Sequence, residues 1–249
     1  MRYNLNDVTF LLMVKYDSIE RIENVVMVCD YLVANYDAHI CLWEIGSHNN
    51  NLFKKLIPPS VNYSFHKDDD PILHRTKYLN LMVEASETDY VAIWDVDVVA
   101  PTHQVNDAAE LLRNGAEFVY PYKFHFYEVS KLFRDMYFDN RDIEFLVAHK
   151  SFMNELYSPH PVGGAFMAKR QSYIDSGLEN VNFYGWGIED GERFLRWSVQ
   201  HRIIKRVTGC LFHLTHGRGT NSLMRTIEES INKKRILLKA GRGIQWKNS

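Results

Sequence analysis

Apolar and polar positions along the chain follow two spacings that alternate. Short apolar runs, typical of buried strands, are separated by stretches in which apolar residues recur every three or four positions, as in helices. We expect strands over residues 8–14, 39–45, 61–65, 91–94 and 165–168. We expect helices over residues 18–33, 70–87, 104–114 and 189–201. This β-α-β-α order predicts an α/β fold with a mainly parallel central sheet.

Three residues mark the expected helix ends. Ser18 can cap the first helix, because its hydroxyl can accept a hydrogen bond from a free amide of the first turn. Pro71, which follows Asp70, suits the first turn of the second helix, where no N–H is needed. Gly115 ends the third helix, since glycine readily adopts the left-handed conformation found there. The second helix would carry Arg75 on one face.

Two segments depart from this alternation. Residues 122–158 are dense in aromatic and charged side chains, which favours an inserted pair of helices packed over the sheet. Some of these aromatic faces could instead line a groove for sugar rings. Residues 222–249 are basic, with apolar residues at helical spacing, which predicts an amphipathic helix. That helix either lies on the protein surface or contacts an anionic membrane that holds a lipid-linked acceptor.

The composition limits the class of protein. A chain of 249 residues with 46% hydrophobic and 24% charged residues fits one globular domain. The net charge of -2 argues against a nucleic-acid partner. Cys29, Cys41 and Cys210 show no paired spacing and are expected to be reduced thiols. We see no signal peptide and no apolar run of the roughly 20 residues that span a bilayer, so we expect a cytoplasmic location.

The strand over residues 91–94 ends in the strongest chemical signal of the chain. Asp95-Val96-Asp97 follows the apolar run, and alternate residues of an extended chain point to the same side. Two neighbouring carboxylates repel each other, and a divalent cation relieves that repulsion. Ligands bind at this end of the strands in open α/β sheets, so the two acids predict a metal ion that holds nucleotide phosphates. The alternative for an isolated Asp-x-Asp is an ordinary acidic turn.

A second group of candidate residues lies between positions 161 and 216. Gly163-Gly164 lets the backbone approach another group closely before a short strand. Tyr184-Gly185-Trp186-Gly187 places an indole between two glycines, where we expect it to be exposed on a loop. Glu189-Asp190 then opens a helix. Acids at that position often only complement the helix dipole, but the dipole does not explain the aromatic residue before them.

Taken in order, these motifs resemble those of the β-1,4-galactosyltransferases. The resemblance begins with Arg75, Lys77 and Asn80 on the second helix and ends at His216, more than half of the chain. The combination is specific, although each part alone is weak. That family consists of metal-dependent inverting glycosyltransferases with the GT-A fold, a Rossmann-like nucleotide-sugar-binding domain. The resemblance implies one GT-A domain over residues 1–249, with a nucleotide-binding half (1–121), an acceptor and catalytic half (122–221) and a basic C-terminal helix (222–249).

The resemblance also assigns roles to the matched residues. Asp97, His213 and His216 would bind the metal, which is Mn2+ or alternatively Mg2+; the vertebrate enzymes carry Met where this chain has His213. Asp190 would be the catalytic base that takes the proton of an acceptor hydroxyl. The expected substrate-binding residues are Arg75 on the nucleotide side, Trp186 and Glu189 at the sugars, Arg218 in a glycine-rich loop that can close over the diphosphate, and Asp95 and Gly164.

These inferences predict an enzyme that transfers galactose or N-acetylgalactosamine from a UDP-sugar to a glycan or lipid-linked saccharide. A retaining transferase of the same fold with another UDP-sugar remains open, and in it Asp190 would not be the base. A nucleotidyltransferase would share the metal strand but would not explain the Trp186 loop. A non-catalytic nucleotide-sugar-binding module is the alternative from another class. The chain looks like a bacterial cytoplasmic enzyme of polysaccharide biosynthesis, with optional contact to the inner face of the plasma membrane.

Overall fold

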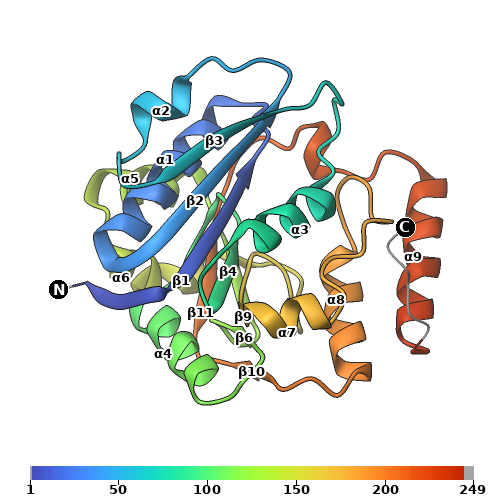
Figure 1. Cartoon of the computed structure of the whole chain (residues 1–249). Coiled ribbons are helices and arrows are strands. Elements are labelled where there is room, and N and C mark those ends of the chain that lie inside the picture. Colours follow the sequence, from blue (N-terminus) through green and yellow to red (C-terminus); the bar gives the residue numbers. More distant parts are fainter. Residues whose placement is uncertain (1, 244–249) are drawn as a thin grey trace.

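The computed structural model describes residues 2–243, which form a layered α/β domain around a seven-stranded sheet (Figure 1). The strand order is β10-β6-β9-β4-β1-β2-β3. Neighbouring strands run parallel except for β9, which is antiparallel to both β4 and β6, so the predicted mainly parallel sheet is confirmed. The strands are β1 (Tyr3–Val14), β2 (Tyr36–Gly46), β3 (Asn62–Lys67), β4 (Tyr90–Trp94), β6 (Phe118–Tyr120), β9 (Ala165–Lys169) and β10 (Ile204–Arg206).

Helices surround this sheet. They are α1 (Ile19–Asn35), α2 (Leu52–Leu56), α3 (Arg75–Ala85), α4 (Thr102–Arg113), α7 (Arg170–Asp175), α8 (Glu189–Val199) and α9 (Ile227–Ala240). Ser18 caps α1 as predicted, because its hydroxyl accepts a hydrogen bond from the Arg21 amide at 3.2 Å. The C-terminal helix α9 packs on α8 at the edge of the molecule (Figure 1). Residues 244–249, the end of the predicted C-terminal helix, lie outside the described residues.

The second helix begins later than predicted. It starts at Arg75 and not at Pro71, because side chains capture the backbone amides of the preceding segment. The Asp70 carboxylate accepts a hydrogen bond from the Ile72 amide at 2.9 Å, and Asn221 accepts one from the Leu73 amide at 2.8 Å. The segment therefore turns around these side chains before the helix begins.

A second, four-stranded sheet has the order β5-β11-β7-β8. Its strands are β5 (Val98–Val99), β7 (His125–Val129), β8 (Asn154–Glu155) and β11 (Cys210–Leu214). The predicted helical pair is present as α5 (Lys131–Asn140) and α6 (Ile143–His149). Phe126 and Tyr127 of that segment, however, belong to strand β7. This strand is held by parallel pairing with β11, a contact between segments far apart in the chain that local periodicity does not reveal.

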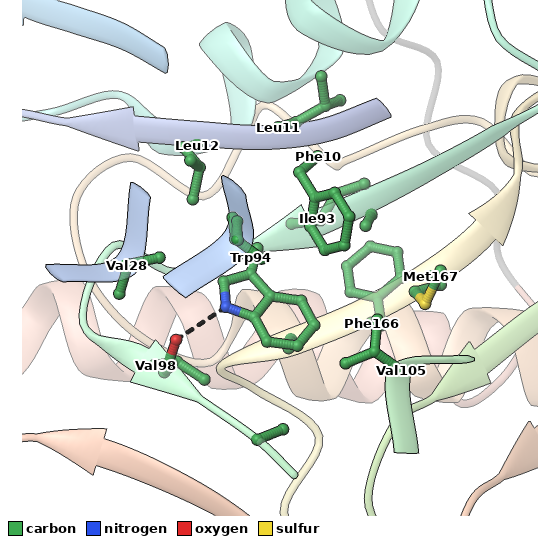
Figure 2. Close-up of a cluster of buried hydrophobic side chains, with 14 of the residues drawn as sticks. Phe10, Leu11, Leu12, Val28, Ile93, Trp94, Val98, Val105, Phe166 and Met167 are labelled. Carbon is green, nitrogen blue, oxygen red and sulfur yellow. Dashed lines mark hydrogen bonds between the residues drawn. The ribbon is translucent and has the colours of Figure 1, made fainter. Parts of the chain in front are cut away.

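Trp94 lies in the core directly before the acidic motif. Figure 2 shows its indole among buried side chains from β1, α1, α4 and β9. The ring of Phe10 meets it edge to face, with ring centroids 5.6 Å apart. The indole Nε1 donates a hydrogen bond to the carbonyl oxygen of Val98 at 2.8 Å, so Trp94 and Val98 fix both ends of the turn that carries the two acids.

Two observations bear on the composition. Cys29, Cys41 and Cys210 are free thiols, as predicted. Burial raises the pKa of the Cys29 thiol to about 12, so this cysteine is an unreactive core side chain. Within residues 2–243, no helix combines the length and the apolar character that crossing a membrane requires.

Candidate active site

A cavity of about 430 Å³ lies at the carboxyl ends of β1 and β4. This is the edge where ligands bind in open α/β sheets. The wall of the cavity is built from the turns after β1 and β4, the end of β11 and the start of α8. All ten residues predicted as functional lie on this wall: Arg75, Asp95, Asp97, Gly164, Trp186, Glu189, Asp190, His213, His216 and Arg218.

Asp97, His213 and His216 form a compact set of three potential metal ligands. Each offers one atom, and the three atoms lie within 4.8 Å of one another. The Asp97 Oδ2 is 3.1 Å from the His216 Nε2 and 3.8 Å from the His213 Nε2. Burial lowers the pKa of His213, which favours the neutral imidazole that a metal ion requires. The chain bends between the two histidines, as their spacing required, because β11 ends at Leu214.

Arg21 lies beside this ligand set, although no motif in the sequence marks it. Its guanidinium is 3.6 Å from the Asp97 Oδ2 and 3.4 Å from the His216 Nδ1. Asp17 and Ser222 hold Arg21 in place by accepting hydrogen bonds at 3.1 and 2.9 Å. Burial acts to raise the pKa of Asp97, but the neighbouring imidazoles and Arg21 outweigh it, so the pKa lies well below its usual value. The Asp97 carboxylate is therefore ionised at neutral pH.

The other acid of the motif, Asp95, is paired with Arg75. Its Oδ1 is 2.5 Å from a guanidinium nitrogen of Arg75. Burial raises the pKa of Asp95 to about 6; Arg75 opposes this rise, and the carboxylates of Asp97 and Asp190 add to it. The buried Nη1 of Arg75 has no hydrogen-bond partner within residues 2–243. A hydrogen-bond donor without a protein partner on a cavity wall is suited to bind an oxygen atom of a ligand.

Glu189 and Asp190 form an acid pair at the start of α8, as predicted. Glu189 is only 6% exposed, and its Oε2 has no hydrogen-bond partner among the described residues. Burial raises the pKa of Glu189 to about 7, and the charge of Asp190 contributes to this rise. The side chain of Asp190 is 33% exposed, so it is the more accessible of the two acids.

Arg193 orients Asp190 from one helical turn away. Its guanidinium donates to the Asp190 Oδ1 at 2.6 Å and to Glu179 at 3.0 Å. The Arg193 and Glu179 side chains are each 1% exposed, so this ion pair is fully buried. The spacing of three residues between Asp190 and Arg193 is visible in the sequence, but only the fold shows that Glu179 anchors the pair.

Gly163 and Gly164 serve two different close approaches. A Cβ at Gly163 would lie 2.7 Å from the Asp190 Oδ2, so any side chain there would displace the carboxylate. Gly164 has a φ of +82°, and a Cβ there would lie 2.8 Å from a methyl group of Leu211. The carbonyl oxygen of Gly164 accepts a hydrogen bond from the Asp95 amide at 2.9 Å. The glycine pair thus joins the metal strand to the acid pair.

Trp186 differs from the prediction in one respect. It lies on a loop between two glycines, but its side chain is partly buried on the cavity wall and not freely exposed. The reason is that the segment before and within α9 packs against the loop, and Lys233 donates a hydrogen bond to the Trp186 carbonyl oxygen at 2.7 Å. Arg218 is exposed at the rim of the same cavity.

Comparison with solved structures identifies the fold. The catalytic domain of Drosophila β1,4-galactosyltransferase 7, in complex with xylobiose, matches with a TM-score of 0.58 and 14% identity over 96% of this chain and 80% of that chain. Glucosyl-3-phosphoglycerate synthase from Mycobacterium tuberculosis, in complex with Mn2+, UDP and glucosyl-3-phosphoglycerate, matches with a TM-score of 0.55 and 14% identity. The match covers 96% of this chain and 81% of that chain. A mannosyltransferase from Pyrobaculum calidifontis, in complex with GDP-Man and Mn2+, matches with a TM-score of 0.54 and 14% identity. The match covers 86% of this chain and 58% of that chain.

These similarities establish the GT-A fold for this chain, so the predicted fold is confirmed. No family model matches the sequence, and no curated protein matches it significantly. At identities this low, the structures that match share the architecture and do not assign a substrate.

The buried acid Glu189 predicts a pH dependence of stability. Its pKa is raised from 4.5 to about 7, so the folded state binds more protons than the unfolded state between these values, and stability should fall as pH rises through this window. In chelator, the melting temperature of the wild-type protein should decrease between about pH 5 and 8. Glu189→Gln should flatten this decrease, whereas Glu87→Gln, at an exposed position, should not. An unchanged slope in Glu189→Gln would contradict the assignment.

Proposed function

We propose that this chain is a metal-dependent inverting glycosyltransferase that transfers galactose or N-acetylgalactosamine from a UDP-sugar to a glycan acceptor. The observation that carries this proposal is a single cavity lined both by a metal-ligand set and by the Glu189-Asp190 pair. Residues 1–121 supply Arg75, Asp95 and Asp97 to this cavity, which fits a nucleotide-binding half. Residues 122–221 supply the acid pair and both histidines, which fits the acceptor and catalytic half.

The donor set of the metal site favours Mn2+ over Mg2+. One carboxylate and two imidazoles suit a transition-metal ion, whereas Mg2+ prefers oxygen ligands. When bound, the ion would offset charge on the diphosphate leaving group. Arg21 lies close enough to share that charge, and Arg75, on the cavity wall, has a buried Nη1 donor without a partner among the described residues. Two of the similar structures were solved with Mn2+ and either UDP or GDP-Man, which supports a nucleotide-sugar donor.

The choice of UDP and of the sugar rests on the resemblance of the Trp186 loop and acid pair to the galactosyltransferase motifs. One similar structure was solved with manganese, UDP-Gal and xylobiose, and another with GDP-Man. A donor screen should therefore compare UDP-galactose, UDP-N-acetylgalactosamine, UDP-glucose and GDP-mannose, reading release of the nucleoside diphosphate. The expected result is release of UDP from UDP-galactose or UDP-N-acetylgalactosamine, and no release of a nucleoside diphosphate from UDP-glucose or GDP-mannose.

Asp190 is the proposed catalytic base. In the reaction, an acceptor hydroxyl oxygen forms a bond to the anomeric carbon while the bond from that carbon to the diphosphate oxygen breaks. The electron pair leaves with the diphosphate, and the hydroxyl proton passes to Asp190. Arg193 holds one oxygen of the Asp190 carboxylate, which fixes its orientation without filling the cavity. Glu189, with its raised pKa, can share a proton with a sugar hydroxyl near neutral pH.

Asp190→Asn should separate catalysis from a structural role in the first turn of α8. Asn has the same shape and its side-chain oxygen can still accept the hydrogen bond from Arg193, so the fold and UDP binding should persist. Turnover should fall by about 100-fold or more, because a general base contributes roughly 10²–10⁴. Asp107→Asn, at an exposed position on α4, is the matched control and should keep wild-type turnover. A near-wild-type rate for Asp190→Asn would remove the catalytic role, and an α-linked product from an α-linked donor would show a retaining mechanism.

The outward face of α9 supports a further part of the proposal, contact with an anionic membrane that presents a lipid-linked acceptor. Three large apolar side chains, Ile227, Ile231 and Leu238, are exposed on this face. They lie at helical spacing on one side of α9. The cations Arg235, Lys239 and Arg242 are exposed beside them. An apolar stripe flanked by cations is typical of helices that lie at a membrane surface.

Vesicle sedimentation tests this contact. The wild-type protein should sediment with vesicles that contain phosphatidylglycerol and not with pure phosphatidylcholine vesicles, and added salt should weaken the binding. The triple variant Ile227→Ser, Ile231→Ser, Leu238→Ser should lose most of this binding, by about tenfold or more, since each apolar side chain contributes buried area. Leu132→Ser, at an exposed position on α5, is the control. Equal sedimentation of wild-type protein with both vesicle types would contradict membrane contact.

A further inference from the structure

Lys233 is a buried lysine on α9. It is 3% exposed. Its Nζ donates a hydrogen bond to the carbonyl oxygen of Trp186 at 2.7 Å and lies 2.8 Å from the Glu229 Oε1. A buried ammonium group is unfavourable unless it is paired and hydrogen-bonded, and both partners here are specific. The position of Lys233 therefore connects the C-terminal helix to the candidate sugar-binding loop.

The residues before Lys233 hold the same loop from other sides. Glu229 accepts hydrogen bonds from the amide and the guanidinium of Arg225 at 3.2 and 3.1 Å. The Arg225 guanidinium in turn lies 4.7 Å from the centroid of the Tyr184 ring. A Cβ at Gly187 would lie 3.0 Å from the terminal methyl group of Met224, so that methionine packs directly on the loop. The segment from Met224 to Lys233 thus encloses the Trp186 loop.

The loop itself has little internal means to hold one conformation. Gly185 and Gly187, which flank Trp186, have φ angles of +72° and +101°. Glycine loses more conformational freedom on ordering than any other residue, so a loop with two glycines depends more strongly on contacts from outside it. Among the described residues, Lys233 is the donor that bonds the Trp186 carbonyl oxygen. Trp186 lines the cavity, and the position of its side chain there depends on this backbone.

We propose that Lys233 is a positioning residue that orders the Trp186 loop for binding of the acceptor sugar. This inference rests on the proposed function. Removing the ammonium should loosen the loop and weaken sugar binding. The nucleotide side should be unaffected, because Arg75, Asp95 and Asp97 are held by contacts that do not involve α9. The expected signature is a raised KM for the acceptor with unchanged affinity for UDP.

The test compares Lys233→Met with Lys234→Met, the adjacent lysine on the exposed side of α9. Methionine keeps the apolar stem and removes the donor. With a soluble acceptor, Lys233→Met should raise the acceptor KM by about tenfold or more, in line with the loss of a hydrogen bond from a charged donor. Lys234→Met should keep wild-type kinetics. Lys233→Arg keeps the charge and N–H donors and should restore part of the loss.

Two further measurements separate positioning from a merely structural role. Hydrogen exchange of amides 184–188 should become faster in Lys233→Met but not in Lys234→Met. In a Trp186→Ala background, Lys233→Met should add little to the acceptor KM, because the side chain that it positions is gone. Unchanged exchange in Lys233→Met, or faster exchange with an unchanged acceptor KM, would overturn the proposal. If the wild-type protein transfers no sugar at all, the proposed function fails, and the exchange measurement still decides whether Lys233 orders the loop.

Discussion

The candidate site depends on the pairing of two short strands. β5 is only two residues long and pairs antiparallel with β11, so Val98 lies opposite His213. The Leu214 amide also donates a hydrogen bond to the Asp97 carbonyl oxygen at 2.7 Å. These contacts join the turn after β4 to a strand near the other end of the chain. Without them, Asp97 and the two histidines would belong to separate parts of the structure and could not share an ion.

A second constraint is the pairing of charge around the cavity. Three of its four carboxylates have an arginine partner from elsewhere in the chain or from the next helical turn: Asp95 with Arg75, Asp97 with Arg21, and Asp190 with Arg193. Buried acids require such partners, because desolvation otherwise makes the ionised form unfavourable. Within residues 2–243 no arginine forms an ion pair with Glu189, and burial together with the charge of Asp190 raises its pKa. The cavity therefore combines the ionised carboxylate of Asp97, cations suited to phosphates, and two acids, Asp95 and Glu189, whose pKa values are raised toward neutrality.

The sequence predicts those features that depend on local patterns of residues. Strand periodicity located β4 with Asp95 and Asp97 at its end, and the acid pair located the start of α8; the roles of Asp97 and Asp190 came from the resemblance to the galactosyltransferase motifs. Arg21, Glu179 and Lys233 could not be found by such patterns, because each acts through a tertiary contact with a distant residue. Strand β7 was not predicted for the same reason, because it is specified by its pairing with β11. The late start of α3 was not predicted either, because it is set by hydrogen bonds to Asp70 and Asn221.

The central claim is that Asp97, His213 and His216 hold a metal ion that helps to bind a nucleotide diphosphate. Calorimetric titration of UDP in the presence of Mn2+ and in the presence of a chelator tests it most directly. The claim predicts that UDP binds at least about tenfold more tightly with Mn2+, because the ion adds a charge-stabilised contact to the diphosphate. Asp97→Asn and His216→Ala should abolish this difference and leave a folded protein. Equal UDP affinity in Mn2+ and in chelator for the wild-type protein would contradict the claim.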